Sequence, residues 1–462
     1  MSQSPFSTLK LNPDLLTNLS TLGYETMTPI QAQSLPHILA GTDVIAQGKT
    51  GSGKTAAFGL GLLENLNVKR FRVQTLVLCP TRELADQVAT EIRRLARGIH
   101  NIKVLTLCGG VPFGPQVGSL EHGAHIIVGT PGRVDEHLRK GTLHLDELNT
   151  FVLDEADRML EMGFQEAVEE IADLMPKRRQ TLLFSATFPE EIKAIAQRIM
   201  LKPVMVKVEF KHDELSIKQH FYKVDDNEQR VTALRLLLLM HRPESTVIFC
   251  NTKKEAQEAA NELHDFGFSV LALHGDLDQK DRDQTLVRFS NKSVSILVAT
   301  DVAARGLDID SLDAVINYHI ARDPEIHLHR IGRTGRAGSK GIACSLISDK
   351  ESHKVIALGN YLDRAIEGEP LPSINFLDKP VFEPEMATLQ IEGGKKQKVR
   401  PGDILGALTG DNGIAGNQVG KINVFDNWAY VAVKREVTQV ALKKLGQGQL
   451  KGRSFRIRLI RD

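Results

Sequence analysis

Gly48-Lys49-Thr50-Gly51-Ser52-Gly53-Lys54-Thr55 is the stretch that decides the fold of this chain. It fits the pattern G-x-x-x-x-G-K-[ST], follows the apolar run Val44–Ala46 and precedes the helix-forming run Ala56–Phe58. Its glycines allow backbone N–H groups to surround phosphate oxygens, and the new helix points the positive end of its dipole at them. The stretch therefore predicts a nucleoside triphosphate site, in which Lys54 reaches the β- and γ-phosphates and Thr55 binds Mg²⁺.

A second stretch, Phe151-Val-Leu-Asp154-Glu155-Ala-Asp157, is an apolar strand that ends in carboxylates. Acidic residues at the end of a strand often only mark the point where the chain leaves the apolar core. A P-loop enzyme, however, needs an acid at this place to hold Mg²⁺ and another to orient the attacking water. We assign the first role to Asp154, acting through water, and the second to Glu155.

The composition is that of an ordinary globular protein of several domains, with 462 residues, 42% hydrophobic and 25% charged. No apolar run of about 18 residues occurs, and the N-terminus lacks the layout of a signal peptide. The cysteines have neither metal-ligand nor disulfide spacing. They are Cys79, Cys108, Cys250 and Cys344. These features favour a cytoplasmic protein with buried thiols and no membrane association.

Charge is distributed unevenly along the chain. Residues 386–462 contain fourteen basic and six acidic residues, a net charge of +8, whereas residues 1–385 carry a net charge of −7. A basic end on an acidic body is typical of a module that binds a polyanion, although a solvated surface can show the same bias.

Apolar strand-like runs alternate with helical patterns twice along the chain, which predicts two α/β units with parallel sheets. The first unit has runs at 44–46, 75–79, 104–108, 125–129, 151–153, 181–184 and 204–208, and the second has runs at 245–250, 269–273, 295–299, 314–318 and 342–347. A proline-rich linker follows, and then a βαββαβ pattern. We expect domains at 1–209, 210–366 and 386–462, with the linker at 367–385.

With these motifs in view, residues 6–350 resemble the DEAD-box RNA helicases, a family with two tandem RecA-like domains. Gly23-Tyr24 to Gln31, with Phe6 upstream, resembles the Q motif, in which Gln31 reads the adenine edge and an aromatic ring, Phe6 or Tyr24, packs on it. Ser185-Ala186-Thr187 resembles the motif that couples hydrolysis to strand separation, through Ser185 and Thr187. The resemblance implies ATP and Mg²⁺ as cofactors.

Other loops resemble the RNA-backbone motifs of the family. In the first unit they are Pro80–Ala85, Gly109-Gly110 and Thr130–Arg133, and in the second they are Val247–Thr252, His274-Gly275, Gln279–Arg282 and Ala299–Asp301. The resemblance implies RNA contacts for Arg82, Gly110, Thr130, Arg133, Thr252, His274, Gly275, Arg282, Thr300 and Asp301. Each such loop follows a strand, where ligands of parallel sheets bind.

Two further segments resemble those that meet ATP from the second domain. They are Arg305–Asp308, with Gly306 and Asp308 as nucleotide contacts, and His329–Arg336. Arginines supplied from a second domain stabilise the γ-phosphate in transit. Arg333 and Arg336 are three residues apart, so on a helical turn they would face the same side. We assign both as catalytic.

The C-terminal segment 386–462 resembles an RNA-recognition-motif domain found in bacterial DEAD-box helicases of large-subunit assembly. The stretch Asp426–Val433 matches the usual aromatic motif only in part. Strand alternation puts Trp428 and Tyr430 on one sheet face, where they can stack bases or pack beneath a loop, and Ala429 and Val431 toward the helices. Lys395 and Lys396 are expected to contact phosphates.

The resulting function is an ATP-dependent RNA helicase, that is, an RNA-stimulated ATP hydrolase that opens short duplexes. The resemblance implies large-subunit ribosomal RNA within a pre-ribosomal particle as its partner. An ATP-gated RNA clamp, or an RNP remodeller in which unwinding is incidental, is the alternative. A DNA helicase is disfavoured by the Q motif and the C-terminal domain, so no DNA partner is expected.

Overall fold

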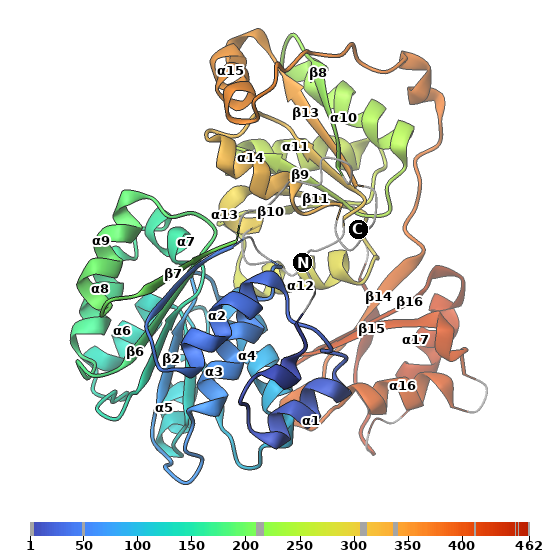
Figure 1. Ribbon diagram of the computed structural model, residues 1–462. Coiled ribbons are helices and arrows are strands. Elements are labelled where there is room, and N and C mark those ends of the chain that lie inside the picture. The colour runs from blue at the N-terminus through green and yellow to red at the C-terminus, as the bar shows by residue number, and fades with distance from the viewer. Residues whose placement is uncertain are drawn as a thin grey trace. The chain divides into compact units, whose positions relative to one another are not determined.

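The computed structural model describes residues 4–48, 51–208, 217–304, 312–335, 341–410, 413–448, 450 and 452–460. These residues form two compact units, one before residue 209 and one after residue 216, and each is described by itself (Figure 1). In the described part of the chain, no helix combines the length and the apolar character that a membrane crossing requires.

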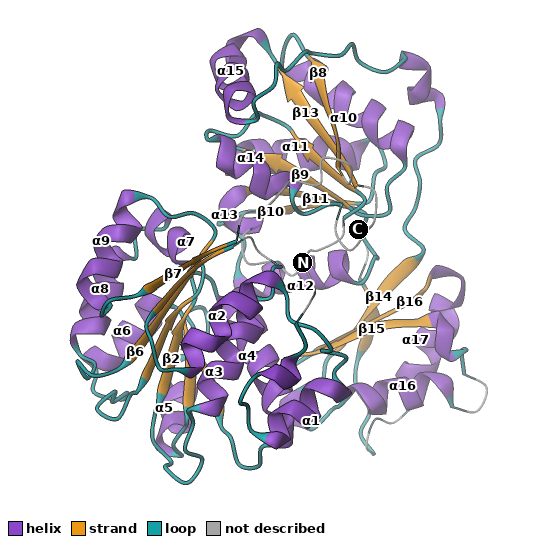
Figure 2. Ribbon diagram, in the orientation of Figure 1, coloured by secondary structure: helices purple, strands orange, loops and turns teal. Residues whose placement is uncertain are grey.

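The first unit is a parallel sheet of seven strands covered by helices, as predicted (Figure 2). Its strand order is β3-β4-β2-β5-β6-β1-β7. The strands are β1 (Val44–Gln47), β2 (Thr75–Leu78), β3 (Val104–Leu107), β4 (Ile126–Gly129), β5 (Thr150–Leu153), β6 (Gln180–Ser185) and β7 (Val204–Lys207). The P-loop strand β1 lies between β6 and β7, so the loop after it opens at the carboxyl edge of the sheet.

The helices of the first unit connect these strands. They are α1 (Pro13–Thr21), α2 (Pro29–Leu39), α3 (Lys54–Glu64), α4 (Arg82–Leu95), α5 (Phe113–Glu121), α6 (Pro131–Arg139), α7 (Ala156–Glu161), α8 (Gln165–Asp173) and α9 (Glu190–Ile199). A short 3₁₀ turn, Phe6–Thr8, precedes them.

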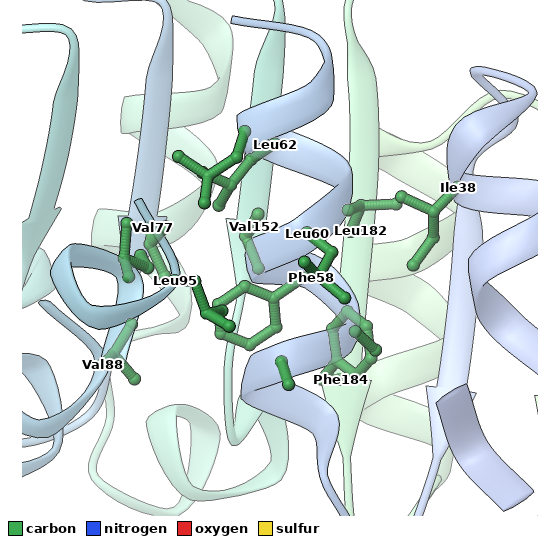
Figure 3. Packing of buried hydrophobic residues seen from close by; sticks show 14 of the residues in the cluster. Ile38, Phe58, Leu60, Leu62, Val77, Val88, Leu95, Val152, Leu182 and Phe184 are labelled. Atoms are coloured by element: carbon green, nitrogen blue, oxygen red, sulfur yellow. The ribbon is translucent and has the colours of Figure 1, made fainter. Parts of the chain in front are cut away.

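Alternating side chains of the strands divide the core into two layers. Phe184 belongs to the cluster beneath α1 to α4, whereas its neighbour Leu183 belongs to the cluster beneath the helices of the other face. Helix α3 lies deep in the first layer, with the ring of Phe58 5.2 Å from that of Phe184 (Figure 3). Burial of these large side chains, at about 25 cal/mol per Å² of apolar surface, fixes the helix that starts in the P-loop.

The second unit begins with a parallel sheet of six strands in the order β10-β11-β9-β12-β13-β8. The strands are β8 (Ile217–Lys223), β9 (Thr246–Cys250), β10 (Val270–Leu273), β11 (Ile296–Thr300), β12 (Ala314–Asn317) and β13 (Gly341–Ile347). The edge strand β8 was not predicted, because His220 and the lysines Lys218 and Lys223 interrupt its apolar pattern.

Its helices are α10 (Asn227–His241), α11 (Lys253–Asp265), α12 (Gln279–Ser290), α13 (Asp301–Ala304), α14 (Pro324–Ile331) and α15 (Ser352–Tyr361). The four cysteines of the chain are free thiols buried in the two sheets or beside them, as expected.

The C-terminal domain has the predicted βαββαβ order. Its elements are β14 (Met386–Ile391), α16 (Pro401–Thr409), β15 (Val419–Val424), β16 (Ala429–Lys434), α17 (Thr438–Gln447) and β17 (Ile457–Leu459). The antiparallel sheet has the order β15-β16-β14-β17. One face packs on the helices, through Ala429, Val431 and Val433 against Ile404 and Ala441.

The segment 367–385 packs on the second unit along much of its length. Its 3₁₀ turn Ile374–Asp378 places Phe376 against the core beneath α10, together with Leu371 and Phe382. The backbone of Glu369 pairs with that of Lys223 at the edge strand β8. The prolines therefore mark a chain segment that is extended but held to the domain.

Candidate functional site

The P-loop has the backbone conformation that its glycines allow. Gly51 and Gly53 have φ angles of 78° and 92°, in the left-handed region that favours glycine. A Cβ atom on Gly53 would lie 2.5 Å from Nε2 of Gln31, so a larger residue would displace the Gln31 side chain from this loop. Lys54 begins α3, is 6% exposed, and donates from Nζ to the carbonyl oxygen of Gly48 at 2.7 Å. Lys49 and Thr50 lie outside the described residues.

Gln31, the predicted adenine reader, is tied to this loop. Helix α2 starts with a capping box in which the Gln31 Oε1 accepts from the backbone N–H of Thr28 at 2.9 Å. Nε2 of Gln31 donates to the carbonyl oxygen of Gly53 at 3.0 Å. The Q motif and the P-loop are therefore one hydrogen-bonded unit, and the adenine contact of Gln31 stays a prediction.

The two aromatic candidates differ in burial. Phe6 is 3% exposed and belongs to the core cluster beneath α2, so packing by itself accounts for its ring. Tyr24 is half-buried and donates its hydroxyl proton to Oε1 of Glu91 at 2.7 Å. The two rings meet edge to face with centroids 6.1 Å apart. Their contact with adenine stays a prediction.

The carboxylates after β5 lie beside the P-loop lysine. Asp154 is 3% exposed, and its Oδ1 is buried without a hydrogen-bond partner. Burial raises the pKa of Asp154 to about 7, although the positive charge of Lys54 lowers it. An orphaned, buried carboxylate oxygen fits a divalent cation, and oxygen is the ligand that Mg²⁺ prefers. Asp154 and the Thr55 hydroxyl are thus suited to hold Mg²⁺.

Glu155 follows in a left-handed backbone conformation, with φ 54°. Such a conformation is uncommon for a residue with a side chain and is often found at functional sites. Its carboxylate lies 3.1 Å from the guanidinium of Arg158, and both side chains are buried. The turn therefore holds Glu155 next to Asp154, and its assigned role of orienting water stays a prediction.

Asp157 links the acidic strand end to the predicted coupling segment after β6. Its Oδ2 accepts from the backbone N–H and the hydroxyl of Thr187, at 2.9 and 3.1 Å. Its own backbone N–H donates to Oγ of Ser185 at 3.3 Å. These hydrogen bonds join the two segments, and the coupling role of Ser185 and Thr187 stays a prediction.

The first unit also gathers its predicted RNA contacts at the carboxyl ends of β2, β3 and β4. Arg82 begins α4, and its Nη1 is buried without a hydrogen-bond partner. Gly110 has φ 74°, and Thr130 precedes α6 as its N-cap. Arg133 lies on the first turn of α6 and donates to the carbonyl oxygen of Val111 at 3.1 Å.

Gln116 is a residue that sequence reasoning missed. Its Oε1 accepts from Nη1 of Arg133 and lies 2.9 Å from Nε2 of His137, and its Nε2 donates to the carbonyl oxygen of Cys108. It therefore joins the Gly110 loop to the segment of Thr130 and Arg133. A single glutamine on an ordinary helix gives no sequence signal of such a role.

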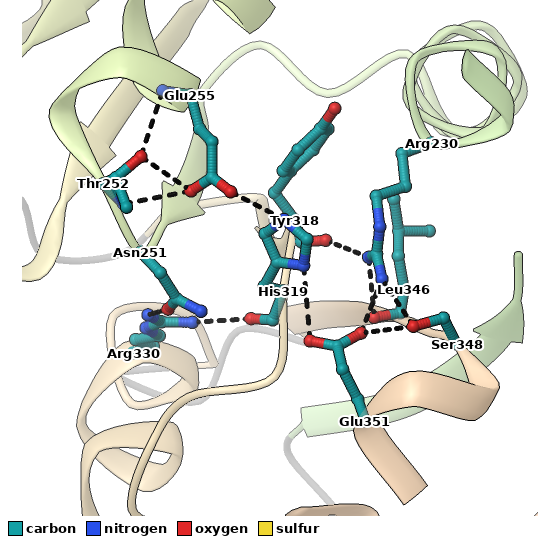
Figure 4. Close-up of polar contacts among 10 residues, drawn as sticks. All are labelled: Arg230, Asn251, Thr252, Glu255, Tyr318, His319, Arg330, Leu346, Ser348 and Glu351. Atoms are coloured by element: carbon teal, nitrogen blue, oxygen red, sulfur yellow. Dashed lines mark hydrogen bonds and ion pairs between the residues drawn. The ribbon is translucent and has the colours of Figure 1, made fainter. Parts of the chain in front are cut away.

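In the second unit, the predicted RNA contacts share the carboxyl edge of three neighbouring strands. Thr252 follows β9, His274 and Gly275 follow β10, and Thr300 ends β11. Thr252 caps α11 in a capping box with Glu255 (Figure 4). His274 is held by Gln257, with Nε2 2.9 Å from Oε1.

Arg282 and Asp301 are engaged inside the unit. Nη2 of Arg282 donates to the carbonyl oxygen of Ala303 at 2.9 Å. Asp301 receives a bidentate pair from Nε and Nη2 of Arg330, each at 2.7 Å. The arginine therefore fixes the Asp301 carboxylate, and the RNA contacts of Arg282 and Asp301 stay predictions.

The helical argument for Arg333 is wrong. Helix α14 ends at Ile331, with Gly332 as its C-cap, and Arg333 follows in a turn, 7% exposed. Gly332 follows the helix as its C-cap, and the three-residue spacing of two arginines does not by itself show that a helix reaches them. Arg336, Gly306 and Asp308 lie outside the described residues, so the assignments of all four residues as ATP contacts stay predictions.

The open face of the C-terminal sheet is covered rather than exposed. Tyr430 is 0% exposed, so the prediction that its ring is available for base stacking is wrong for this structure. On the same face Thr388 accepts from Nδ2 of Asn291 at 2.9 Å, and its Oγ1 lies 2.6 Å from that of Ser293. Polar groups of the helicase domain therefore take the place that bases occupy on an open sheet.

Trp428 is half-buried at the end of this face, 5.9 Å from the ammonium of Lys280. Lys395 and Lys396 are exposed, and their backbone N–H groups donate to the carbonyl oxygens of Phe425 and Asp426, at 2.8 and 2.9 Å. The two lysines are thereby fixed beside the turn that leads to Trp428. This turn is the part of the predicted RNA surface that stays accessible.

Comparisons with known proteins agree with this architecture. The DEAD/DEAH box helicase family matches residues 28–195, the helicase conserved C-terminal domain matches 229–338, and the DbpA RNA binding domain matches 388–459. ATP-dependent RNA helicase DbpA of Escherichia coli (strain K12) is 54% identical over 457 residues, 99% of each chain. DEAD-box ATP-dependent RNA helicase CshA of Geobacillus kaustophilus (strain HTA426) is 42% identical over 370 residues, 80% of this chain and 79% of that one. The structure of S. cerevisiae Dbp5 bound to RNA and ADP BeF3 superposes with a TM-score of 0.72 at 32% identity, covering 82% of this chain and 97% of that one.

Proposed function

Since this chain belongs to the DEAD-box ATP-dependent RNA helicases and ends in a DbpA-type RNA-binding domain, we propose that it opens short duplexes of large-subunit ribosomal RNA during subunit assembly. The observation that carries the proposal is the combination of a hydrolytic site with a separate basic domain of net charge +8. The helicase domains act on RNA in general, and the C-terminal domain selects the RNA.

The first unit binds and hydrolyses ATP. Lys54 neutralises the β- and γ-phosphates, and Gln31 reads adenine while it holds the P-loop at Gly53. Thr55 and Asp154 would hold Mg²⁺, which would supply charge neutralisation at the phosphates. Glu155 orients the attacking water. Asp157 then transmits the change at the phosphates to Thr187, because it bonds directly to that residue.

The second unit completes the site with Arg333 and Arg336. Arginines that reach the γ-phosphate only when two domains meet make hydrolysis depend on closure. RNA that binds both carboxyl edges favours the closed state, so the ATPase is stimulated by RNA. The contacts of these edges are to phosphates and 2′-hydroxyls, which carry no sequence information.

Specificity is then assigned to the C-terminal domain. Lys395 and Lys396, on the turn beside Trp428, supply a salt-dependent phosphate contact, and the half-buried indole offers an edge to a base. Tyr430 has a packing role beneath this surface.

A competition assay tests the assignment. RNA-stimulated ATPase activity is measured with a large-subunit ribosomal RNA fragment and with a scrambled RNA of equal length. In the full chain, Lys395→Glu with Lys396→Glu should weaken the response to the ribosomal fragment at least tenfold and reduce the slope of log affinity against log salt by about 2. Lys177→Glu with Arg178→Glu, an equal charge change on exposed residues of the first unit, is the control. Equal loss in both variants would reject the assignment.

A strand-displacement assay distinguishes the proposed helicase from the alternative of an ATP-gated clamp. A helicase releases one strand of a short duplex with ATP and turns over repeatedly, whereas a clamp holds RNA equally well with a non-hydrolysable nucleotide. The clamp would be favoured if strand release were complete with the non-hydrolysable nucleotide and if ATP did not increase the number of duplexes that each enzyme opens.

A further inference from the structure

Gln116, on α5 of the first unit, is a buried amide with hydrogen bonds at both of its ends. Its Oε1 accepts from Nη1 of Arg133 at 2.9 Å and lies 2.9 Å from Nε2 of His137. Its Nε2 donates to the carbonyl oxygen of Cys108 at 3.0 Å. Because a buried amide must find its partners inside the protein, these contacts tie α6, which carries Arg133 and His137, to the end of β3.

The partners of this amide determine its orientation. The carbonyl oxygen of Cys108 can only accept a hydrogen bond, and the guanidinium of Arg133 can only donate one. A flipped amide would place two oxygen atoms together at Cys108 and two N–H groups together at Arg133. Since Oε1 of Gln116 is therefore the atom that faces His137, Nε2 of that histidine carries a proton and donates it.

His137 is thereby held in one tautomer. With the proton on Nε2, the neutral ring accepts at Nδ1, which lies 2.8 Å from the hydroxyl oxygen of Thr142. Burial and then the charge of Arg133 lower the pKa of His137, so the ring is neutral at pH 7. The ring also stacks on that of Phe113 on α5, with centroids 4.2 Å apart. An aromatic contact therefore supports the tie that the amide makes between α5 and α6.

The two ends of the amide reach the two segments of this region that the proposed function assigns to the RNA backbone. Cys108 directly precedes the loop Gly109-Gly110. Arg133 lies on the first turn of α6, for which Thr130 is the N-cap, and the Thr130 side chain makes no capping hydrogen bond. The start of a helix attracts phosphate, so both segments offer polar groups to one RNA strand.

We propose that Gln116 is a positioning residue for RNA, which sets the separation between the loop Gly109-Gly110 and the Thr130 segment. The proposal rests on the proposed function, which assigns both segments to the RNA backbone. The backbone of a strand fixes the spacing of its phosphates, so two segments that bind one strand must keep a matching separation. Segments that are held in place before the strand arrives lose less entropy when it binds.

Gln74 offers a matched control in the same unit. It is 2% exposed, and its amide makes three hydrogen bonds, two with the backbone of Asn67 and one with the carbonyl oxygen of Arg70. Gln74 directly precedes β2, whereas Cys108 directly follows β3, and these two strands run in the same direction. Gln74 therefore lies at the amino edge of the sheet, opposite the predicted RNA contacts.

The experiment measures RNA-stimulated ATP hydrolysis by the full chain, with a single-stranded RNA of unrelated sequence, and urea unfolding of the same samples. Gln116→Met keeps the length of the side chain but removes the amide. It should raise the RNA concentration for half-maximal stimulation about tenfold, the scale of one hydrogen bond to a charged group. The rate at saturating RNA should change less than about twofold, because binding rather than the chemical step is affected. The slope of log affinity against log salt should fall in magnitude by about 0.7, the value for one phosphate of a single strand.

Gln74→Met should lower the urea midpoint as Gln116→Met does, because each substitution removes three buried hydrogen-bonded contacts. It should leave the RNA affinity and the salt slope at their wild-type values. Equal weakening of RNA binding by both variants would overturn the proposal, because it would show a general effect of lost stability. Wild-type RNA affinity in Gln116→Met would overturn it as well.

If Gln116→Met fails to fold, Gln116→Glu decides. This variant keeps an oxygen for Arg133 and His137 but sets a second oxygen against the carbonyl oxygen of Cys108. The charge of Arg133 favours the ionised carboxylate, which cannot donate, so only the tie to β3 is broken. RNA binding should again weaken about tenfold, and wild-type affinity in this variant would overturn the proposal.

Thr130→Val tests the proposed function by itself. If it weakens RNA affinity while Gln116→Met does not, only the positioning role of Gln116 fails. If neither substitution weakens RNA affinity, the assignment of the Thr130 segment to RNA fails, and the positioning role fails with it.

Discussion

Individual ionisable residues of the same type in this protein lie in very different surroundings. Two histidines of the second unit show the contrast. His319 lies between two carboxylates, whereas His327 on α14 stacks on Phe221 with ring centroids 6.0 Å apart. Both ring nitrogens of His327 are buried without hydrogen-bond partners. The same residue type therefore faces two carboxylates at one position and packs as an apolar ring at the other.

Glu155→Gln tests the assignment of the catalytic carboxylate. Glutamine has nearly the same shape and can adopt the same backbone conformation, but it cannot accept a proton from water. Nucleotide affinity should stay within about threefold, and single-turnover hydrolysis should slow by about 10² or more, the scale of a lost general base. Fluorescent nucleotide binding and phosphate release measure the two quantities. Normal phosphate release would rule out this role for Glu155.

His327 predicts a pH dependence of stability. Burial lowers the pKa of His327 to about 3, with the charges of Arg330 and Arg364 adding to the effect. The unfolded chain, with an ordinary histidine pKa near 6.5, binds the proton more readily, so stability falls as pH drops below about 6.5. Between pH 7 and 5.5 this residue should account for a loss of about 1 kcal/mol.

His327→Phe should remove that part of the pH dependence, because phenylalanine stacks on Phe221 and takes up no proton. Urea unfolding followed through Trp428, the single tryptophan of the chain, reports on the second unit. A variant that loses as much stability as the wild type between the two pH values would contradict the prediction.

Among the elements, β16 shows how alternation and packing act together. Ala429, Val431 and Val433 face the helices as the two-residue period requires. Tyr430 faces the opposite side and is as deeply buried. Its hydroxyl has no hydrogen-bond partner among the described residues, and burial raises its pKa to about 12. The strand is therefore buried on both faces, although its sequence matches the aromatic RNA-binding motif in part.

Two substitutions of Tyr430 separate packing from recognition. Tyr430→Phe removes a buried hydroxyl that has no partner, so stability should be unchanged or higher by up to about 1 kcal/mol, with RNA affinity unchanged. Tyr430→Ala should cost about 3 kcal/mol because it leaves a cavity. Urea unfolding and RNA titration measure both effects. A several-fold loss of RNA affinity in Tyr430→Phe would show instead that the hydroxyl contacts RNA.

At the scale of the whole molecule, the chemistry is divided between two units that lie far apart in the sequence. Lys54, Asp154 and Glu155 belong to the first unit, and Arg333 belongs to the second. In the proposed function, hydrolysis therefore requires groups that no single unit supplies. The C-terminal domain belongs to the same second unit and contacts Asn291 and Ser293 of its helicase part through Thr388.

Arg336→Ala tests whether the second unit contributes to the chemical step. The variant should bind nucleotide as the wild type does and hydrolyse it about 10³-fold more slowly, the scale of a lost arginine finger. Nucleotide affinity is compared with the single-turnover rate at saturating RNA. A loss confined to affinity, with turnover intact, would identify a contact made in the ground state.

A chain that ends at Glu385 tests whether the ATPase activity of the helicase domains is independent of RNA selection by the C-terminal domain. It should retain ATPase activity with unrelated RNA at high concentration, because the sites of both units remain. It should lose its preference for a ribosomal RNA fragment over a scrambled one. Discrimination as sharp as that of the full chain would place the specificity in the helicase domains. The Thr388→Val full-length variant controls for the contact that truncation removes.

The amino-acid sequence determined the class of fold, the P-loop, the acidic strand end and the βαββαβ order. These features depend on local patterns: period-two and continuous apolar runs select strands, and glycines at set spacings select the phosphate loop. Lys54 could be named because it is part of the P-loop pattern, Asp154 because it ends an apolar strand, and Gln31 because its segment resembles the Q motif of the family. The family resemblance then placed the RNA-facing loops at the carboxyl edges of the strands.

Only the tertiary structure decided what depends on contacts between residues distant in the sequence. Gln116 joins two loops, Arg330 fixes Asp301, and His319 lies between Glu255 and Glu351, over separations that no local pattern reports. Tyr430 is buried because another domain covers its sheet face, whereas its strand pattern is the same whether that face is open or closed. Helix α14 ends at Ile331 because glycine is unfavourable inside a helix and Gly332 follows as the C-cap. The three-residue spacing of Arg333 and Arg336 in the sequence gives no information on this helix end.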